Sequence, residues 1–393
     1  MDREQVLENV LNISNNNVLL EFPTGFGKTK SAFNLMDKYK PEKILIAIQK
    51  LVHENVWRNE FSKWGYESYL PKVTFVTHVS LHKHINKEYD YVIMDEAHHI
   101  TEISIWAINK IITPRLLFLS GTVSTEKKFL LNYNIKDLFT YKIYMREAQE
   151  AGIIPTPTVY LIPLYLDNTK RIFKTEKNTK AHKKIIVNYQ DRWSYMKDKS
   201  IHLVLQCTAQ EYYEDISSQI EWYKNKWQQQ GVVAMRNIWL QTCNRRLSFL
   251  SNLKTEFIKE LLNHLKNKRV VTLCDSIDQA TKVCANAMHS KNKKSLELYE
   301  SFNAKEFNHL AACDMLNEGA NLEDCQYGIY ANLNSSDTLV RQRLGRLLRH
   351  PEPILIIPYY VNTRDEELKD QMLLKYNAQE IKIISNINEI ELC

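Results

Sequence analysis

The stretch Phe22-Pro23-Thr24-Gly25-Phe26-Gly27-Lys28-Thr29 decides the fold of this chain. It follows the apolar run 18–21 and precedes the helix-like run 31–38, so it forms a turn from a strand into a helix. Glycines at this position let the backbone wrap closely around phosphate oxygens. The stretch therefore predicts a nucleotide-phosphate loop rather than a ligand-free glycine turn, although Phe22 stands where the general pattern has glycine.

Each residue type in this loop has a chemical reason. The backbone of Gly25, Phe26 and Gly27 is expected to cradle the phosphates of ATP. The Lys28 ammonium would meet the β and γ phosphates, and the Thr29 hydroxyl would reach Mg²⁺. The predicted cofactors are therefore ATP and Mg²⁺.

A second motif, Asp95-Glu96-Ala97-His98-His99, ends an apolar strand. In an open parallel sheet ligands bind beyond the carboxyl ends of the strands. We expect Asp95 to hold Mg²⁺, Glu96 to orient and deprotonate the attacking water, and His98 to sense the γ phosphate. His99 is interpreted as structural.

A third motif, Gln342-Arg343-Leu344-Gly345-Arg346-Leu347-Leu348-Arg349, lies far along the chain. On a helix, Gln342, Arg346 and Arg349 share one face. Arginines aimed across a cleft can stabilise the charge that develops on a transferring phosphoryl group. Together with the phosphate loop, this pattern favours a catalytic role over a solvated basic helix.

The order of strand-like and helix-like segments predicts two α/β domains with parallel sheets. The predicted strands are 18–21, 43–48, 73–77, 91–95, 116–120, 270–275, 310–314, 328–332 and 353–360. The predicted boundaries are a first domain over 1–160, a basic, aromatic and largely helical insert over 161–254, and a second domain over 255–393. The prolines at 155 and 157 mark the end of the first domain, because closely spaced prolines cannot continue a helix.

The insert carries the positive charge of the protein. Residues 165–254 contain 16 Lys and Arg against 8 Asp and Glu, whereas the whole chain has a net charge of +6. Four of the seven tryptophans also lie there. This composition fits a nucleic-acid clamp, in which Lys183, Lys184 and Arg192 bind phosphates and aromatic rings stack on bases. It fits equally a small helical domain with a solvated basic face and tryptophans in its core.

The remaining composition bounds the class of protein. With 393 residues, 44% of them hydrophobic, the chain can bury two cores. It has no apolar run of membrane-spanning length, no secretory signal and no Cys-x-x-Cys pair among its seven cysteines. We therefore expect an intracellular protein in the cytoplasm, which would be the host cytoplasm if a phage encodes it, with no membrane partner.

In this order the motifs resemble those of a superfamily two helicase or translocase of the DEAH type. The resemblance implies two tandem RecA-like domains that hydrolyse ATP between them, with Arg346 and Arg349 as arginine fingers. It also implies that Gln5 reads the adenine, that Ser120-Gly121-Thr122 links the ATP state to domain closure, and that Gly319, in the motif over 314–322, lies near the nucleotide.

Nucleic-acid contacts are implied by the same resemblance at Lys50, Thr77, His78 and Ser276. The predicted partner is single- or double-stranded DNA in preference to RNA, with a replication or recombination protein as a further candidate partner. The sequence thus predicts an ATP-driven motor that unwinds, remodels or translocates on nucleic acid. The alternative is a nucleotide-gated clamp that binds nucleic acid and hydrolyses ATP slowly without unwinding.

Overall fold

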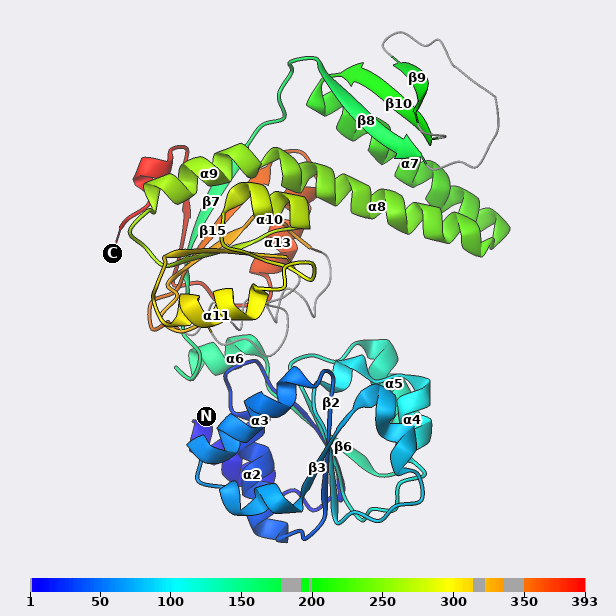
Figure 1. Cartoon of the computed structure of the whole chain (residues 1–393), viewed down its shortest axis with the longest axis vertical. Helices are drawn as coiled ribbons and strands as arrows, with labels where there is room; N and C mark the ends of the chain where they lie inside the picture. Colours follow the sequence, from blue (N-terminus) through cyan, green and yellow to red (C-terminus); the bar gives the residue numbers. More distant parts are fainter. Residues whose placement is uncertain (1, 178–191, 198–199, 314–321, 335–349, 393) are drawn as a thin grey trace.

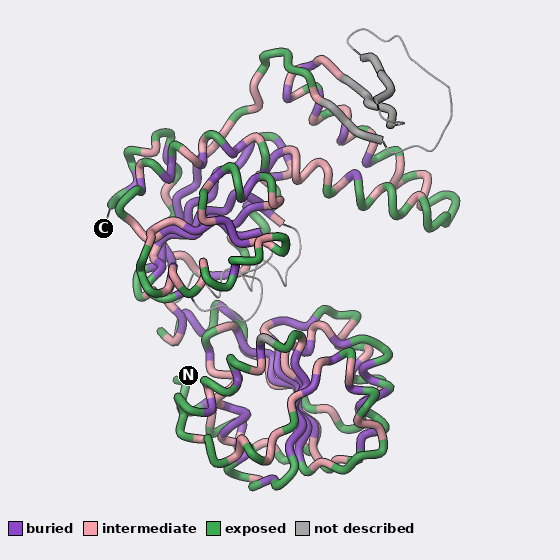
Figure 2. The backbone as a smooth tube through the Cα atoms, in the orientation of Figure 1, coloured by how far each residue is buried: buried purple, intermediate pink, exposed green. Residues whose placement is uncertain are grey.

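The computed structural model describes residues 2–177, 192–197, 200–313, 322–334 and 350–392. Two α/β domains and a projecting insert make up this part of the chain (Figure 1). In each of the two domains buried strands run through the centre, and exposed residues lie on the surrounding helices and loops (Figure 2). None of the helices in the described ranges is both long and apolar enough to cross a membrane.

The first domain is built on a parallel sheet with the strand order β3-β2-β4-β5-β1-β6. Its strands are continuous apolar runs because helices cover both faces of the sheet. Helices α1, α2 and α3 pack on one face, and α4 and α5 pack on the other. The elements are β1 (Asn17–Glu21), β2 (Ile44–Ile48), β3 (Val73–Thr77), β4 (Tyr91–Met94), β5 (Leu116–Ser120), β6 (Leu138–Lys142), α1 (Arg3–Leu11), α2 (Lys28–Tyr39), α3 (Val52–Lys63), α4 (Glu102–Ile108), α5 (Thr125–Asn134) and α6 (Met145–Glu150), with short 3₁₀ turns η1 (Glu67–Lys72), η2 (His78–His84) and η3 (Ala97–His99).

The second domain also contains a parallel sheet, ordered β12-β13-β11-β14-β15-β7-β16. Helices α9 and α10 pack on one face, and α11 and α13 pack on the other. The elements are β7 (Thr158–Leu164), β11 (Val270–Leu273), β12 (Ala287–Met288), β13 (His309–Ala312), β14 (Tyr327–Tyr330), β15 (Ile354–Tyr360), β16 (Glu380–Ile383), α9 (Thr255–His264), α10 (Ile277–Val283), α11 (Ser295–Asn303), α13 (Arg364–Leu373) and the 3₁₀ turn η4 (Ile387–Glu389).

The insert combines a small antiparallel sheet with a long helical hairpin. The sheet has the order β8-β10-β9, from β8 (Arg171–Lys177), β9 (Arg192–Lys197) and β10 (Ser200–Cys207). Helices α7 (Ala209–Gln230) and α8 (Val233–Leu253) follow and project away from the second domain (Figure 1). The hairpin was expected from the helical pattern, but the sheet was not.

The insert branches from the second domain. Strand β7 pairs in parallel with both β15 and β16, so the sheet of the second domain already includes residues 158–164 before the insert begins. The sequence-based boundary at residue 160 cuts through this strand, and the insert therefore lies between two elements of the second domain rather than between the two domains. The partners of β7 are about two hundred residues away in sequence, so no local pattern identifies them.

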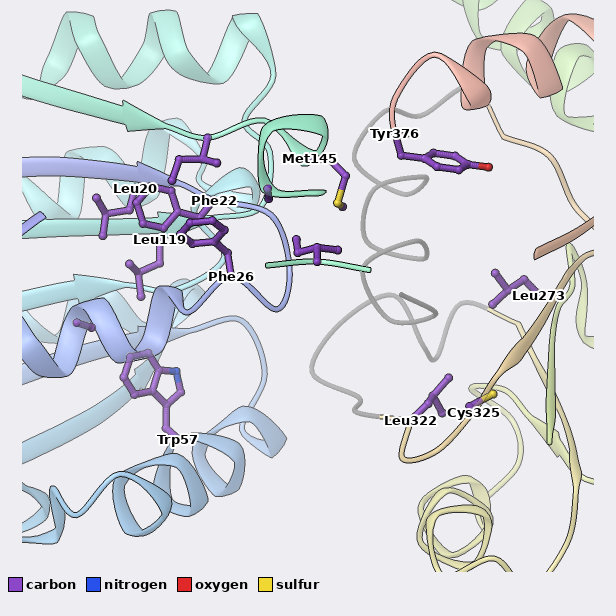
Figure 3. Close-up of a cluster of buried hydrophobic side chains, with 14 of the residues drawn as sticks. Leu20, Phe22, Phe26, Trp57, Leu119, Met145, Leu273, Leu322, Cys325 and Tyr376 are labelled. Carbon is purple, nitrogen blue, oxygen red and sulfur yellow. The ribbon is translucent and has the colours of Figure 1, made fainter. Parts of the chain in front are cut away.

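Helix α6 joins the two domains. The Gln149 side chain donates from Nε2 to the Asn377 carbonyl (3.0 Å), and the Asn377 backbone N–H donates to Gln149 Oε1 (2.7 Å). Asn377 follows α13 of the second domain. Figure 3 shows Met145 of α6 between core residues of the first domain, such as Phe22, and core residues of the second, such as Tyr376.

Candidate active site

The phosphate loop forms the turn from β1 into α2. Gly25 (φ +85°) and Gly27 (φ +116°) have backbone conformations that residues with a Cβ rarely adopt. Gly27 is also the N-cap of α2, so the loop ends at the positive end of a helix dipole. The two glycines are therefore required by the turn itself, which presents backbone N–H groups as an anion cradle does.

Two aromatic side chains anchor this loop. Phe22 and Phe26 are fully buried, and their ring centroids lie 5.2 Å apart (Figure 3). Phe22 thus replaces the glycine of the general pattern with a residue that packs into the core. Lys28 donates from Nζ to the carbonyl oxygen of Phe22 (3.1 Å), which holds the ammonium over its own loop.

The acidic motif lies directly after β4. Its backbone continues the sheet, because the Asp95 N–H donates to the Ala47 carbonyl (2.9 Å). Trp57 of α3 donates its indole N–H to Asp95 Oδ2 (2.9 Å), and the Glu96 N–H donates to Asp95 Oδ1 (3.0 Å). Both carboxylate oxygens of Asp95 are therefore held in place.

The electrostatics of Asp95 are unusual. Part of the residue is accessible to solvent, but its carboxyl group is packed among protein atoms. Burial, and next the adjacent Glu96 carboxylate, raise the pKa of Asp95 to about 7, against the hydrogen bond from Trp57 and the charge of Lys28. A charged Asp95 is thus costly in the ligand-free protein, and a cation beside it would lower that cost.

A hydrogen-bonded chain links the acidic motif to the loop after β5. His98 Nδ1 lies 3.3 Å from Glu96 Oε2 and 3.2 Å from Ser120 Oγ, and the Ser120 hydroxyl donates to the Thr122 carbonyl (3.1 Å). A Cβ added at Gly121 would lie 3.9 Å from Lys28 Nζ. The structure therefore gathers the phosphate loop, the acids and the Ser120-Gly121-Thr122 motif at one edge of the sheet.

The donor set at this edge fits Mg²⁺. The ion prefers hard oxygen ligands and binds through few protein groups. The Thr29 hydroxyl in the first turn of α2 and the Asp95 carboxylate are oxygen donors of this kind. A divalent ion would also offset the repulsion that Glu96 imposes on Asp95.

Comparison with known proteins supports this reading of the site. The family model described as "Type III restriction enzyme, res subunit" matches residues 2–125, and "Helicase conserved C-terminal domain" matches residues 253–351. The two matches cover both α/β domains. The chain is a superfamily two helicase. It is an ATP-hydrolysing enzyme that uses this energy to unwind, or to move along, a nucleic acid.

Solved structures share the fold of this helicase at low sequence identity. The Pyrococcus furiosus Hef helicase domain aligns with a TM-score of 0.50 and 13% identity, over 94% of this chain and 97% of that chain. S. cerevisiae Dbp5, solved bound to RNA and ADP BeF3, aligns with a TM-score of 0.59 and 10% identity, over 98% of this chain and 89% of that chain. A comparison with curated proteins finds no match.

The remaining predicted nucleotide contacts of the helicase are placed unevenly. Gln5 is exposed on α1, and two residues before it Arg3 donates to the Gly25 carbonyl (3.3 Å), a contact to the phosphate loop that the sequence did not predict. The other predicted residues of this group lie outside the described part of the chain: Gly319, Gln342, Arg346 and Arg349.

The predicted nucleic-acid contacts divide in the same way. Lys50 is exposed after β2, and Thr77 is half-buried at the end of β3. Ser276 caps α10, because its hydroxyl accepts from the Gln279 N–H (3.1 Å). Lys183 and Lys184 lie outside the described residues, as does the side chain of Arg192.

His78 differs from its prediction. Its side chain is buried, and burial lowers the pKa of the imidazole to about 4. A neutral ring inside the protein presents no charge or surface to a nucleic-acid strand in this conformation. The prediction rested on the position of His78 after β3, which does not determine the direction of the side chain.

The site of the helicase includes two residues that sequence reasoning missed. Trp57 contacts Asp95 from α3, and no local pattern marks it, because the contact spans 38 residues of chain. Glu21 had a signal, since an acid at the end of an apolar strand is unusual where it is buried. It lies directly before the phosphate loop.

Proposed function

We propose that this helicase belongs to the DEAH-type branch and that its ATP hydrolysis is Mg²⁺-dependent. The chain of contacts from Glu96 through His98 to Ser120, beside the Lys28 loop, carries the proposal. It brings a carboxylate base, a positive charge and the motif after β5 to one place. Such an arrangement is what hydrolysis of a phosphoanhydride by water requires.

The proposed roles follow from the chemistry of each side chain. Lys28 and the backbone of the loop bind the phosphates, while Glu96 orients the attacking water and takes its proton. His98 holds the Glu96 carboxylate in position through Nδ1. Thr29 and Asp95 would hold Mg²⁺, which when bound neutralises charge on the β and γ phosphates.

Binding and hydrolysis can be separated by two variants. Glu96→Gln keeps the phosphate loop but lacks the base, so we expect near-normal nucleotide affinity and a loss of turnover of about a hundredfold or more. Lys28→Ala should weaken binding as well as turnover. Nucleotide affinity by calorimetry and single-turnover hydrolysis would be measured on both, with circular dichroism to establish folding. Normal hydrolysis by folded Glu96→Gln would contradict the assignment.

We also propose that the insert contributes to nucleic-acid binding through the end of its α7–α8 hairpin. Trp222 is 53% exposed, and Lys226 Nζ lies 5.6 Å from the centre of its ring. The rings of Trp227 and Trp239 stack at 5.3 Å, and the guanidinium of Arg236 lies 6.0 Å from the Trp227 ring. Exposed aromatic faces beside basic groups suit a strand with bases and phosphates.

The clamp can be tested without altering the ATP site. Replacing Lys224, Lys226 and Arg236 together with Ala should reduce the salt dependence of binding by up to about three phosphate contacts, measured as the slope of log affinity against log salt. Basal ATPase should persist. A matched control removes three ion-paired surface lysines of the second domain, Lys259, Lys282 and Lys305, and should leave the slope unchanged. Equal slopes for both triple variants would favour the solvated-face interpretation of the insert.

For the substrate we propose DNA rather than RNA, with a replication or recombination protein as partner. Support comes from the family model of the first domain, which is named for a restriction enzyme, and restriction enzymes cut DNA. ATPase rates with single-stranded DNA, duplex DNA and RNA of one sequence would test this proposal. Stimulation by RNA alone would contradict it, and binding with neither unwinding nor translocation would favour a gated clamp.

A further inference from the structure

Glu21 is a buried carboxylate that the chemistry described above does not use. It is the last residue of β1, directly before the phosphate loop, and its side chain is 2% exposed. Such a group is costly to bury unless charged or hydrogen-bonded partners surround it. Its partners therefore show what the protein gains from it.

Three elements supply these partners. Lys128 of α5 places Nζ 2.6 Å from Glu21 Oε2, and Lys142 at the end of β6 places Nζ 3.7 Å from Oε1. The backbone N–H of Val123, in the loop after β5, donates to Oε1 (3.3 Å). The sheet register aligns Glu21 with Ser120 on one side and Lys142 on the other. The carboxylate thus ties together the ends of three adjacent strands.

One side of this cluster leads to the proposed reacting groups. Val123 directly follows Ser120-Gly121-Thr122, so its hydrogen bond to Glu21 restrains that loop. Ser120 contacts His98, and His98 contacts Glu96. Two side chains and one short loop therefore separate Glu21 from the proposed catalytic base.

The other side leads to the joint between the domains. The Ile143 N–H donates to the backbone carbonyl of Glu21 (3.0 Å), which extends the pairing of β6 past Lys142. Helix α6 begins two residues later, and its Gln149 forms the paired hydrogen bonds with Asn377 of the second domain. A shift of β6 relative to β1 would therefore be transmitted to α6.

We propose that Glu21 is a positioning residue that couples the hydrolytic site to the interdomain joint. It does not touch the nucleotide. Through Val123 it fixes the loop that orients His98 and Glu96, and through Lys142 it fixes the strand that leads to α6. The proposal rests on the proposed roles of Glu96 and His98, because without them the loop would have no catalytic group to orient.

Two variants divide the contacts of Glu21. Glu21→Gln keeps an oxygen that accepts from the Val123 N–H but removes the charge that attracts Lys128 and Lys142. Glu21→Ala removes both functions. Because both lysines are partly exposed, with side-chain exposures of 29% and 26%, water can solvate them in either variant and the fold should survive.

The expected result is a loss of turnover without a loss of nucleotide affinity. With saturating nucleic acid, Glu21→Ala should lower kcat by between about tenfold and a hundredfold, as misplacement of a catalytic group by about 1 Å does. The KM for ATP and the calorimetric nucleotide affinity should change by less than about twofold. Glu21→Gln should retain more activity, and the ratio of stimulated to basal ATPase should fall in both variants.

A matched control tests whether stability alone explains the result. Ser251→Ala removes a buried hydrogen-bonding hydroxyl from the second domain, so it should lower the melting temperature and leave kcat and KM unchanged. If Glu21→Ala also lowers only the melting temperature, Glu21 is structural and the inference is wrong. Failure of the proposed function is distinguishable, because it would appear as normal hydrolysis by Glu96→Gln whatever Glu21 does.

Discussion

The two parallel sheets present opposite chemistry at their carboxyl edges. In the first domain the edge leaves a carboxyl group, Asp95, whose pKa is raised to about 7 by burial and by Glu96. In the second domain the corresponding edge consumes its polar groups internally. Asn332 donates to Asp275 Oδ1 (2.9 Å), the Asp275 N–H donates to Gln279 Oε1 (2.9 Å), and Ser251 also donates to Gln279 (2.9 Å).

A buried ion pair reinforces the second edge. Lys254 Nζ lies 2.6 Å from Asp365 Oδ2, with side-chain exposures of 0% and 3%, and it also donates to the Ala331 carbonyl (3.3 Å). One architecture therefore serves two purposes. The first edge is electrostatically unsatisfied and suited to a ligand, whereas the second is satisfied and suited to hold the insert and the domain together.

The largest expected effect would show that the second domain also contributes to the first edge. Arg346→Ala should bind ATP through the phosphate loop but lose about a thousandfold or more in single-turnover hydrolysis, because an arginine finger acts on the transition state. A Lys substitution should rescue it poorly, since a point charge lacks the planar two-pronged donor geometry. Arg364→Ala, which breaks an exposed ion pair in α13, is the control. Normal hydrolysis by Arg346→Ala would contradict a composite site.

Breaking the satisfied edge should cost stability. Asp365→Asn leaves the buried Lys254 ammonium without its carboxylate, and we expect the free energy of unfolding to fall by about 3 to 5 kcal/mol. Denaturant titration of the folded variant would measure it. Replacing both residues, as Lys254→Met with Asp365→Leu, should restore most of the loss, because no charge then stays buried. An unchanged unfolding midpoint for Asp365→Asn would mean that the pair is not part of the stabilising network.

The unsatisfied edge should respond in the opposite direction. The folded protein holds the Asp95 proton up to about pH 7, whereas the unfolded chain releases it near the ordinary value of 3.8, so the contribution of Asp95 to stability is lost as pH rises through this window. Asp95→Asn removes that loss and should raise the metal-free unfolding free energy above pH 7 by about 1 to 3 kcal/mol. The gain should shrink as pH falls to about 5. Asp95→Asn that is less stable than the parent at pH 8 would contradict the comparison.

The smallest expected effect concerns Gly121. A Cβ at this position would meet Thr24 Oγ1 at 3.8 Å and Lys28 Nζ at 3.9 Å, which are ordinary contact distances. Gly121→Ala should therefore change kcat and the unfolding free energy by no more than about 0.5 kcal/mol. Gly27→Ala is the contrasting variant, because φ of +116° strains any residue with a Cβ. A large loss in Gly121→Ala would mean that the loop moves closer to Lys28 during the cycle.

The sequence by itself determined the parts whose information is local. The glycines of the phosphate loop, the acids after β4 and the apolar strands follow from residue type and short-range pattern. Strands predicted at 73–77 and 116–120 have those bounds in the structure. A buried parallel strand is a continuous apolar run, so it can be recognised without knowing its partners.

Only the tertiary structure decided which distant residues meet. The pairing of β7 with β15 placed the insert in the second domain, and burial reversed the expectation for His78. The contact of Trp57 with Asp95 and the cluster around Glu21 join residues tens to more than a hundred positions apart. Such contacts depend on how the crossover helices return the chain to the sheet, and no window of neighbouring residues contains that information.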